Sequence, residues 1–169
     1  MYNDVCLCCN TFCSKSCHIC PENEQRDMFS KQEAQQLKTE FWTAFGKSFP
    51  RKWILYDTKI KDFSFKFSAD NKKAEVSLDI EMRDEVYRNA YFEKIESLEN
   101  MLPDYIGEFS KDEFLILDNG KAISRYWVTL TGVSIYNKNT WQQIFEFFVE
   151  KMDGFERLFY DFEDFIKDV

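Results

Sequence analysis

Histidine, glycine and proline are scarce in this sequence, and cysteine is absent from most of it. The 169 residues include a single histidine, His18, so the rest of the chain lacks the commonest general base of enzymes. All six cysteines precede Pro21, which leaves no cysteine nucleophile farther along. The few glycines form no phosphate-binding loop, and no serine lies in a recognisable triad pattern. These absences argue against most common enzyme classes.

Two further absences bear on location and partners. No apolar run approaches the roughly 20 residues of a membrane span, and the N-terminus lacks the basic start and apolar stretch of a secretory signal. We therefore expect a cytoplasmic protein with no membrane partner, in which stable disulfides are disfavoured. The net charge of −8 opposes direct binding to nucleic acid, because nucleic acid is a polyanion.

Aromatic side chains are abundant instead. They make up 18% of the residues, and 18 of them are phenylalanine. Disordered chains are poor in such residues, so a packed core is expected wherever cysteine is absent. The length fits one domain. We expect a cysteine-rich leader over residues 1–27 and a single domain over residues 28–169.

Four cysteines of the leader have the spacing of two zinc knuckles. Cys6 and Cys9 form one C-x2-C pair, and Cys17 and Cys20 form another. A two-residue spacer lets both thiolates of a pair bind one ion, and zinc prefers four such ligands in a tetrahedron. One interpretation of the leader is therefore a zinc site. Apart from the magnesium of the catalytic alternative described below, the sequence predicts no other cofactor.

The competing interpretation is that the leader is disordered or does not belong to the folded protein. Ser30 and Glu33 form a capping box, and Phe29 occupies the hydrophobic-staple position before it. The first helix thus has a complete start signal of its own. Met28 would then be the true first residue, and the leader an over-extended gene start.

The apolar spacing after the leader predicts three helices and two hairpins. Apolar residues three and four positions apart indicate helices, and alternating ones indicate strands. Asp84 is the expected cap of the second helix, Asn139 that of the third, and Asn119-Gly120 a strong hairpin turn. The expected helices span residues 31–47, 84–101 and 139–166, and the expected strands span residues 62–68, 74–82, 114–118 and 121–130, with residues 132–137 extending the last strand or adding another.

This order of elements indicates an α+β fold, an antiparallel sheet of two hairpins covered by three helices. Matching the apolar faces fixes the register of the first hairpin, with Phe63 opposite Ile80, Phe65 opposite Leu78 and Phe67 opposite Val76. The wide aromatic stripe of the last helix is expected to face the core, the alternative being a groove for a partner helix or a dimer. Gly154 in this helix marks either a close helix contact or a kink.

The polar side of the first hairpin concentrates acidic residues. Its register places Lys66 diagonally between Glu75 and Asp79, and places Asp62 opposite Glu81 as a like-charge pair. Magnesium-dependent nuclease sites use carboxylates to bind the ion, with a lysine nearby. We favour a solvated sheet face, because alternating charge is ordinary in antiparallel sheets. The catalytic alternative would use magnesium with Asp62, Glu75, Asp79, Glu81 and Lys66.

Two other residues are candidates for ligand binding. Arg125 follows the second hairpin turn and would bind a carboxylate or phosphate with two hydrogen bonds, unless it pairs with a neighbouring acid. Trp42 would line a ligand pocket, although core packing is the more common role of such tryptophans.

The domain resembles the bacterial domain of unknown function 4268 family. The residues that carry the resemblance are Glu40-Phe41-Trp42, Ala69-Asp70-Asn71-Lys72-Lys73-Ala74, Ile80-Glu81, Phe92-Glu93, Ile123-Ser124-Arg125, and Gly132-Val133-Ser134-Ile135-Tyr136-Asn137 followed by Trp141. It covers about residue 28 to the C-terminus and leaves the leader unmatched. The resemblance implies no established activity, and it implies a domain found alone or behind nuclease-like domains.

Taken together, the sequence favours a non-catalytic accessory or interaction module over an enzyme. Its partner would be another protein or a second copy of the chain, meeting it on the last helix or on the exposed sheet face. The alternative from a different class is the magnesium-dependent, nuclease-like or nucleic-acid-processing domain.

Overall fold

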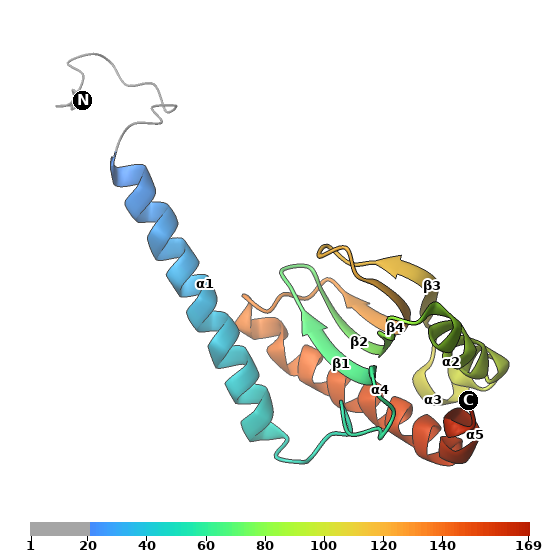
Figure 1. Ribbon diagram of the computed structural model, residues 1–169. Helices are drawn as coiled ribbons and strands as arrows, with labels where there is room; N and C mark the ends of the chain where they lie inside the picture. Colours follow the sequence, from blue (N-terminus) through green and yellow to red (C-terminus); the bar gives the residue numbers. More distant parts are fainter. Residues whose placement is uncertain (1–20) are drawn as a thin grey trace, which may run out of the picture.

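A four-stranded antiparallel sheet lies against helices that pack on one of its faces (Figure 1). The computed structural model describes residues 21–169, with side chains from residue 31 onward. This arrangement confirms the α+β class. Along the chain the elements are α1 (Pro21–Ser48), β1 (Phe63–Ala69), β2 (Lys73–Ile80), α2 (Glu85–Ser97), α3 (Leu102–Ile106), β3 (Ser110–Ile116), β4 (Ala122–Thr131), the 3-10 turn η1 (Lys138–Thr140), α4 (Trp141–Asp161) and α5 (Glu163–Lys167).

The strand order is β1-β2-β4-β3, so the two hairpins lie side by side and join through β2 and β4. The register predicted for the first hairpin is confirmed at all three phenylalanines, with Phe63 paired to Ile80, Phe65 to Leu78 and Phe67 to Val76. Apolar alternation fixes this register, because a shift by one residue would turn every phenylalanine to the other face.

The core lies between the apolar sheet face and the helices α4 and α1. The ring centroids of Phe67 and Phe148 are 4.9 Å apart, and those of Phe65 and Phe155 are 5.7 Å apart. Phe41 of α1 is fully buried beside α4. The aromatic stripe of α4 therefore faces the core, as expected, and is not an open groove.

Gly154 of α4 lies at a close contact with α3. A Cβ built on this glycine would lie 2.2 Å from the carbonyl oxygen of Tyr105 and 3.1 Å from Cγ2 of Ile106. Only a residue without a side chain allows the two helices to approach so closely. Of the two roles expected for this glycine, the structure shows the close contact.

The helix boundaries differ from the sequence prediction in three places. The first helix begins at Pro21, so Ser30 lies inside α1 and does not start it. The second helix ends at Ser97. Pro103 lies in the first turn of a separate helix, α3. The last helix is interrupted at Phe162, which caps both α4 and α5. The structure thus has five α-helices within residues 21–169 where three were predicted.

The segment before α4 also differs from the prediction. Residues 132–137 form no strand within the described chain, and η1 follows them. Asn137 caps η1, and its side chain accepts a hydrogen bond from the backbone N–H of Asn139 at 3.1 Å. The helix α4 has Thr140 at its N-cap, without a capping side-chain hydrogen bond, so the prediction of an Asn139 cap was wrong. In contrast, Asp84 caps α2 as predicted. Among the helices of residues 21–169, none combines the length and apolarity needed to cross a membrane.

Candidate functional site on the polar face of the sheet

The sheet face opposite the packed helices carries the charged side chains singled out from the sequence. Alternation along β1, β2 and β4 sends every second residue to this side. We call it the polar face and define it by Ser64, Lys66, Glu75, Ser77, Asp79, Arg125, Trp127 and Thr129, together with Glu81, which follows β2 and pairs with Lys66. The register brings residues of both hairpins together there, because β2 and β4 are neighbours at the centre of the sheet.

Asp79 and Arg125 form the central ion pair of the polar face. They are directly opposite in the pairing of β2 with β4. Nε and Nη2 of Arg125 each donate a hydrogen bond of 2.7 Å, one to each carboxylate oxygen of Asp79. The Asp79 side chain is fully buried, whereas 23% of the Arg125 side chain is exposed. A buried carboxylate needs such a partner, and the planar guanidinium matches both of its oxygens.

Lys66 connects Asp79 to Glu81. Its Nζ lies 3.1 Å from Oδ2 of Asp79 and 2.6 Å from Oε1 of Glu81. Burial acts to lower the pKa of Lys66, but the hydrogen bond to Glu81 and the charge of Asp79 outweigh it and raise the pKa above 10.5. The register confirms the expected diagonal position of Lys66 between Glu75 and Asp79, but its amine pairs with Asp79 and not with Glu75.

Glu75 has partners of its own, which explains this difference. Its Oε1 accepts hydrogen bonds from Nζ of Lys73 at 2.7 Å and from the hydroxyl of Thr129 at 3.1 Å. Glu75 is thus held by Lys73, which lies beside the turn of the first hairpin, and by Thr129 of β4. Lys66 turns the other way and pairs with Glu81, whose second oxygen lies 3.5 Å from Nζ of Lys121.

Asp62 is the one member of the proposed catalytic set that lies apart from the polar face. It precedes β1 with a positive φ of 59° and lines a different cleft. Its carbonyl oxygen accepts a hydrogen bond of 2.7 Å from the backbone N–H of Glu81, so the two residues are opposite, as expected. Lys66 and Lys121 offset the charge of Glu81 at this like-charge pair.

The structure does not bring the two ligand-binding candidates together. Arg125 lies on the polar face, where Asp79 accepts from Nε and Nη2 along one edge of its guanidinium. Trp42 packs on the other side of the sheet, parallel to Phe148 of α4 with a centroid separation of 5.8 Å and an interplanar angle of 7°. No common pocket is formed by these two side chains.

Three acidic side chains of the polar face are neutralised by neighbouring cations. Glu75, Asp79 and Glu81 each accept from at least one lysine or arginine. Within the part of the chain that the structure describes, no group of three or more aspartate, glutamate, histidine or cysteine side chains is placed to hold a metal ion. The leader cysteines Cys6, Cys9, Cys17 and Cys20 lie outside the described residues.

Trp127 is the side chain whose role the sequence did not distinguish. It lies on the polar face of β4 between two serines, Ser77 of β2 and Ser110 of β3. A shallow hollow of about 200 Å³ lies beside the indole, lined by Ser110 and Thr129 together with Glu108 and Phe109. The strand order was needed to find this site, since neither serine is near Trp127 in the sequence.

The fold and the polar face define the protein as an α+β domain with one helix-covered sheet face and one ion-paired face. A comparison with family models then identifies the family. The model described as "Domain of unknown function (DUF4268)" matches residues 37–163, and the chain belongs to this family. The resemblance noted from the sequence is thereby confirmed. Neither curated proteins nor solved structures give a match.

Proposed function

We propose that the domain is a non-catalytic interaction module that docks another protein on its polar face, with Trp127 as the anchor. The observation that carries the proposal is the partly exposed indole, set between Ser77 and Ser110 beside a hollow of about 200 Å³. Tryptophan is among the residues that contribute most to binding at protein interfaces. A side chain of the partner would fill the hollow and cover the indole.

The charges around Trp127 support docking over chemistry. Asp79 and Arg125 hold each other in a fixed geometry, and Lys66 completes the pair. A catalytic acid or a metal ligand needs free lone pairs, and these carboxylate oxygens already accept strong hydrogen bonds. Paired charges near an exposed tryptophan instead resemble the polar rim of a protein interface, where charged residues set the orientation of the partner.

Site-specific cross-linking tests this proposal. A photoreactive residue at Thr129, which is exposed beside the indole, is expected to capture a protein partner in cells. The Trp127→Ala substitution is expected to lower the yield at least about tenfold, a typical effect of losing an interface anchor. Trp127→Phe is expected to restore part of the yield.

The matched control is Tyr160→Ala, because Tyr160 is 59% exposed on α4, on the far side of the sheet. Capture that is equal in the parent, Trp127→Ala and Tyr160→Ala proteins would overturn the proposal. Sedimentation of the purified domain then shows whether the partner is a second copy of the chain.

A magnesium-dependent, nuclease-like site is the second candidate function. The observation that favours it is that one amine, Nζ of Lys66, lies within 3.1 Å of both Asp79 and Glu81. Glu75 and Asp62 would have to turn toward this point, and Arg125 would have to release Asp79. Magnesium titration followed by NMR tests it, since binding would shift the backbone signals of β2 around Asp79. Saturable shifts there would favour this candidate over docking.

A further inference from the structure

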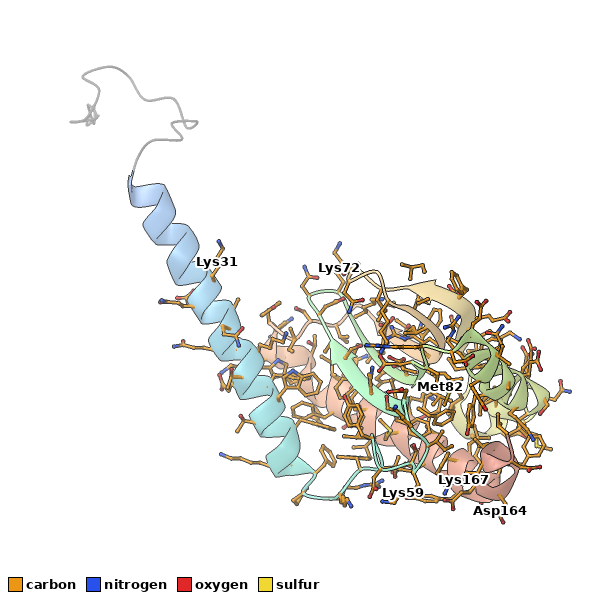
Figure 2. The ribbon with its side chains drawn as sticks, in the orientation of Figure 1. Lys31, Lys59, Lys72, Met82, Asp164 and Lys167 are labelled. Carbon is orange, nitrogen blue, oxygen red and sulfur yellow. The ribbon has the colours of Figure 1, made fainter. Side chains whose placement is uncertain are left out.

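A separate cleft of about 800 Å³ lies at the end of the sheet where β1 begins and β2 ends. The loop before β1, the turn after β2, α2 and α5 form its walls. Figure 2 shows Lys59, Met82 and Lys167 at this end of the molecule, with Lys72 at the opposite end of the first hairpin. The volume falls within the range of about 300 to 1,000 Å³ that is usual for small-molecule sites.

The cleft collects cations in a chain whose net charge is −8. Four of its lining side chains are basic, namely Lys59, Lys61, Arg83 and Lys167, and two are acidic, Asp62 and Asp84. One of the acids is already engaged, because Asp84 accepts the hydrogen bond from the backbone N–H of Val86 that caps α2.

The four cations are not equivalent. Lys59 pairs with Asp57, and Lys167 pairs with Glu163. Among the described residues, Lys61 and Arg83 form no ion pair, and both are exposed at the cleft. They are therefore the donors available to an incoming anion, and an arginine and a lysine together suit a phosphate group.

Aromatic and apolar side chains form the rest of the lining. Tyr87 and Tyr91 lie one helical turn apart on α2, so both side chains face the same side. Tyr91 is anchored against Phe63 with a centroid separation of 5.8 Å, whereas Tyr87 is 56% exposed and offers a free ring face. Met82 and the buried Ile60 add apolar surface. A planar ring would stack in such a place.

The loop that carries Lys61 is held in one conformation before any ligand arrives. The buried hydroxyl of Thr58 donates to the carbonyl oxygen of Phe63 at 2.8 Å and accepts from the backbone N–H of Ile60 at 3.2 Å. Lys59 and Asp62 on either side have positive φ values of 63° and 59°. A fixed loop loses less conformational entropy when it binds a ligand.

We propose that this cleft binds a nucleoside monophosphate, with the base stacked on Tyr87 and the phosphate held by Lys61 and Arg83. A phosphate alone would leave the aromatic wall uncovered, and a neutral planar molecule would leave the two cations without a counter-charge. The site is independent of the proposed docking on the polar face, because the cleft shares no lining residue with the hollow beside Trp127.

Calorimetry with the full chain tests the proposal, using AMP, GMP, CMP and UMP as probes, with adenosine and inorganic phosphate for comparison. At least one nucleotide is expected to bind saturably, and about tenfold or more tightly than adenosine or phosphate, since each supplies only half of the contacts. Arg83→Gln and Lys61→Gln are each expected to weaken binding about five- to tenfold, and Tyr87→Ala at least about fivefold.

Lys72→Gln is the matched control, because it removes one exposed lysine far from the cleft. It is expected to leave binding unchanged. All four substituted side chains are exposed, so each variant is expected to fold, and circular dichroism verifies this. The proposal is overturned if none of the four nucleotides binds, if adenosine binds as tightly as AMP, or if Arg83→Gln weakens binding no more than Lys72→Gln.

Discussion

Asp79 is fully buried on the polar face and depends on its contacts with Arg125 and Lys66. Replacing Arg125 by methionine leaves the carboxylate with one cation, and we expect a loss of about 2 to 4 kcal/mol in the free energy of unfolding. Chemical denaturation of the parent and variant proteins measures this loss. The double variant Asp79→Leu/Arg125→Met is expected to be more stable than Arg125→Met alone, because no uncompensated charge remains.

An exposed pair provides the control for this prediction. Lys73→Gln breaks the ion pair with Glu75, and we expect it to change stability by no more than about 0.5 kcal/mol. The lysine side chain of this pair is 45% exposed, so water already screens the charge. An equal loss for Arg125→Met and Lys73→Gln would contradict the importance assigned to burial at Asp79.

Lys66 gives the polar face a predictable response to alkaline pH. Its pKa is raised above 10.5 in the folded protein, so its charged form stabilises the fold. This contribution is complete below 10.5 and is lost as the pH rises through the raised value. We expect the difference in unfolding free energy between the parent and Lys66→Met to be constant from about pH 7 to pH 10 and to shrink above it. A difference that stays constant into the alkaline range would contradict the prediction.

On the polar face, the sequence predicted the residue pairs between the two strands of one hairpin but not those between strands of different hairpins. The alternation of phenylalanine and aliphatic residues, together with the short turn between the strands, fixed the pairing of β1 with β2, since a shift by one residue would move Phe65 and Leu78 to opposite faces. The contact between Asp79 and Arg125 joins residues 46 positions apart and depends on β2 lying beside β4. No turn connects these two strands directly, so the sequence contains no local signal for their register.

At the scale of whole elements, Gly154 fixes how closely α4 approaches α3. Alanine there would gain helix propensity of about 1 kcal/mol, but its Cβ would lie 2.2 Å from a backbone oxygen of Tyr105. Because backbone cannot move aside cheaply, the clash is larger, and we expect Gly154→Ala to lose a net amount of about 2 kcal/mol or more. Thermal and chemical unfolding measure this loss.

Gly46 is the matched control for this substitution. It also lies in a helix, α1, and a Cβ built there meets no atom within 4 Å among the described residues. We expect Gly46→Ala to raise stability by about 0.5 to 1 kcal/mol, since only the propensity changes. A loss of stability in Gly46→Ala, or a gain in Gly154→Ala, would show that helix packing has been assigned to the wrong glycine.

Helix ends were harder to predict than helix positions. The capping box of Ser30 and Glu33 is a valid start signal, but nothing between Pro21 and Ser30 breaks a helix, and the chain continues through it. The break at Phe162 has no proline or glycine to mark it. Leu158 of α4 and Ile166 of α5 are both buried on either side of the break, and the sequence has no local signal for it.

The family match begins near the first core side chain that the structure describes. The match starts at residue 37, Leu37 packs against the core, and Phe41 is fully buried. We therefore expect a chain of residues 31–169 to melt within about 2 °C of the full chain, because it keeps every one of these contacts. Phe41→Ala in either chain is expected to cost about 3 to 5 kcal/mol, the usual loss for a buried phenylalanine.

The same pair of chains tests the zinc site proposed for Cys6, Cys9, Cys17 and Cys20. Elemental analysis decides between the two interpretations of the leader. A zinc site predicts stoichiometric zinc in the full chain and none in residues 31–169, since thiolates would be the ligands, whereas a leader that does not belong to the folded protein predicts none in either. Any zinc found should be removable by a chelator without changing the melting of the domain, because Leu37 is the first core residue among the described side chains. Absence of zinc from the full chain would rule out the site. A melting temperature that falls on chelation would mean that the zinc-bound leader also stabilises the domain over residues 31–169.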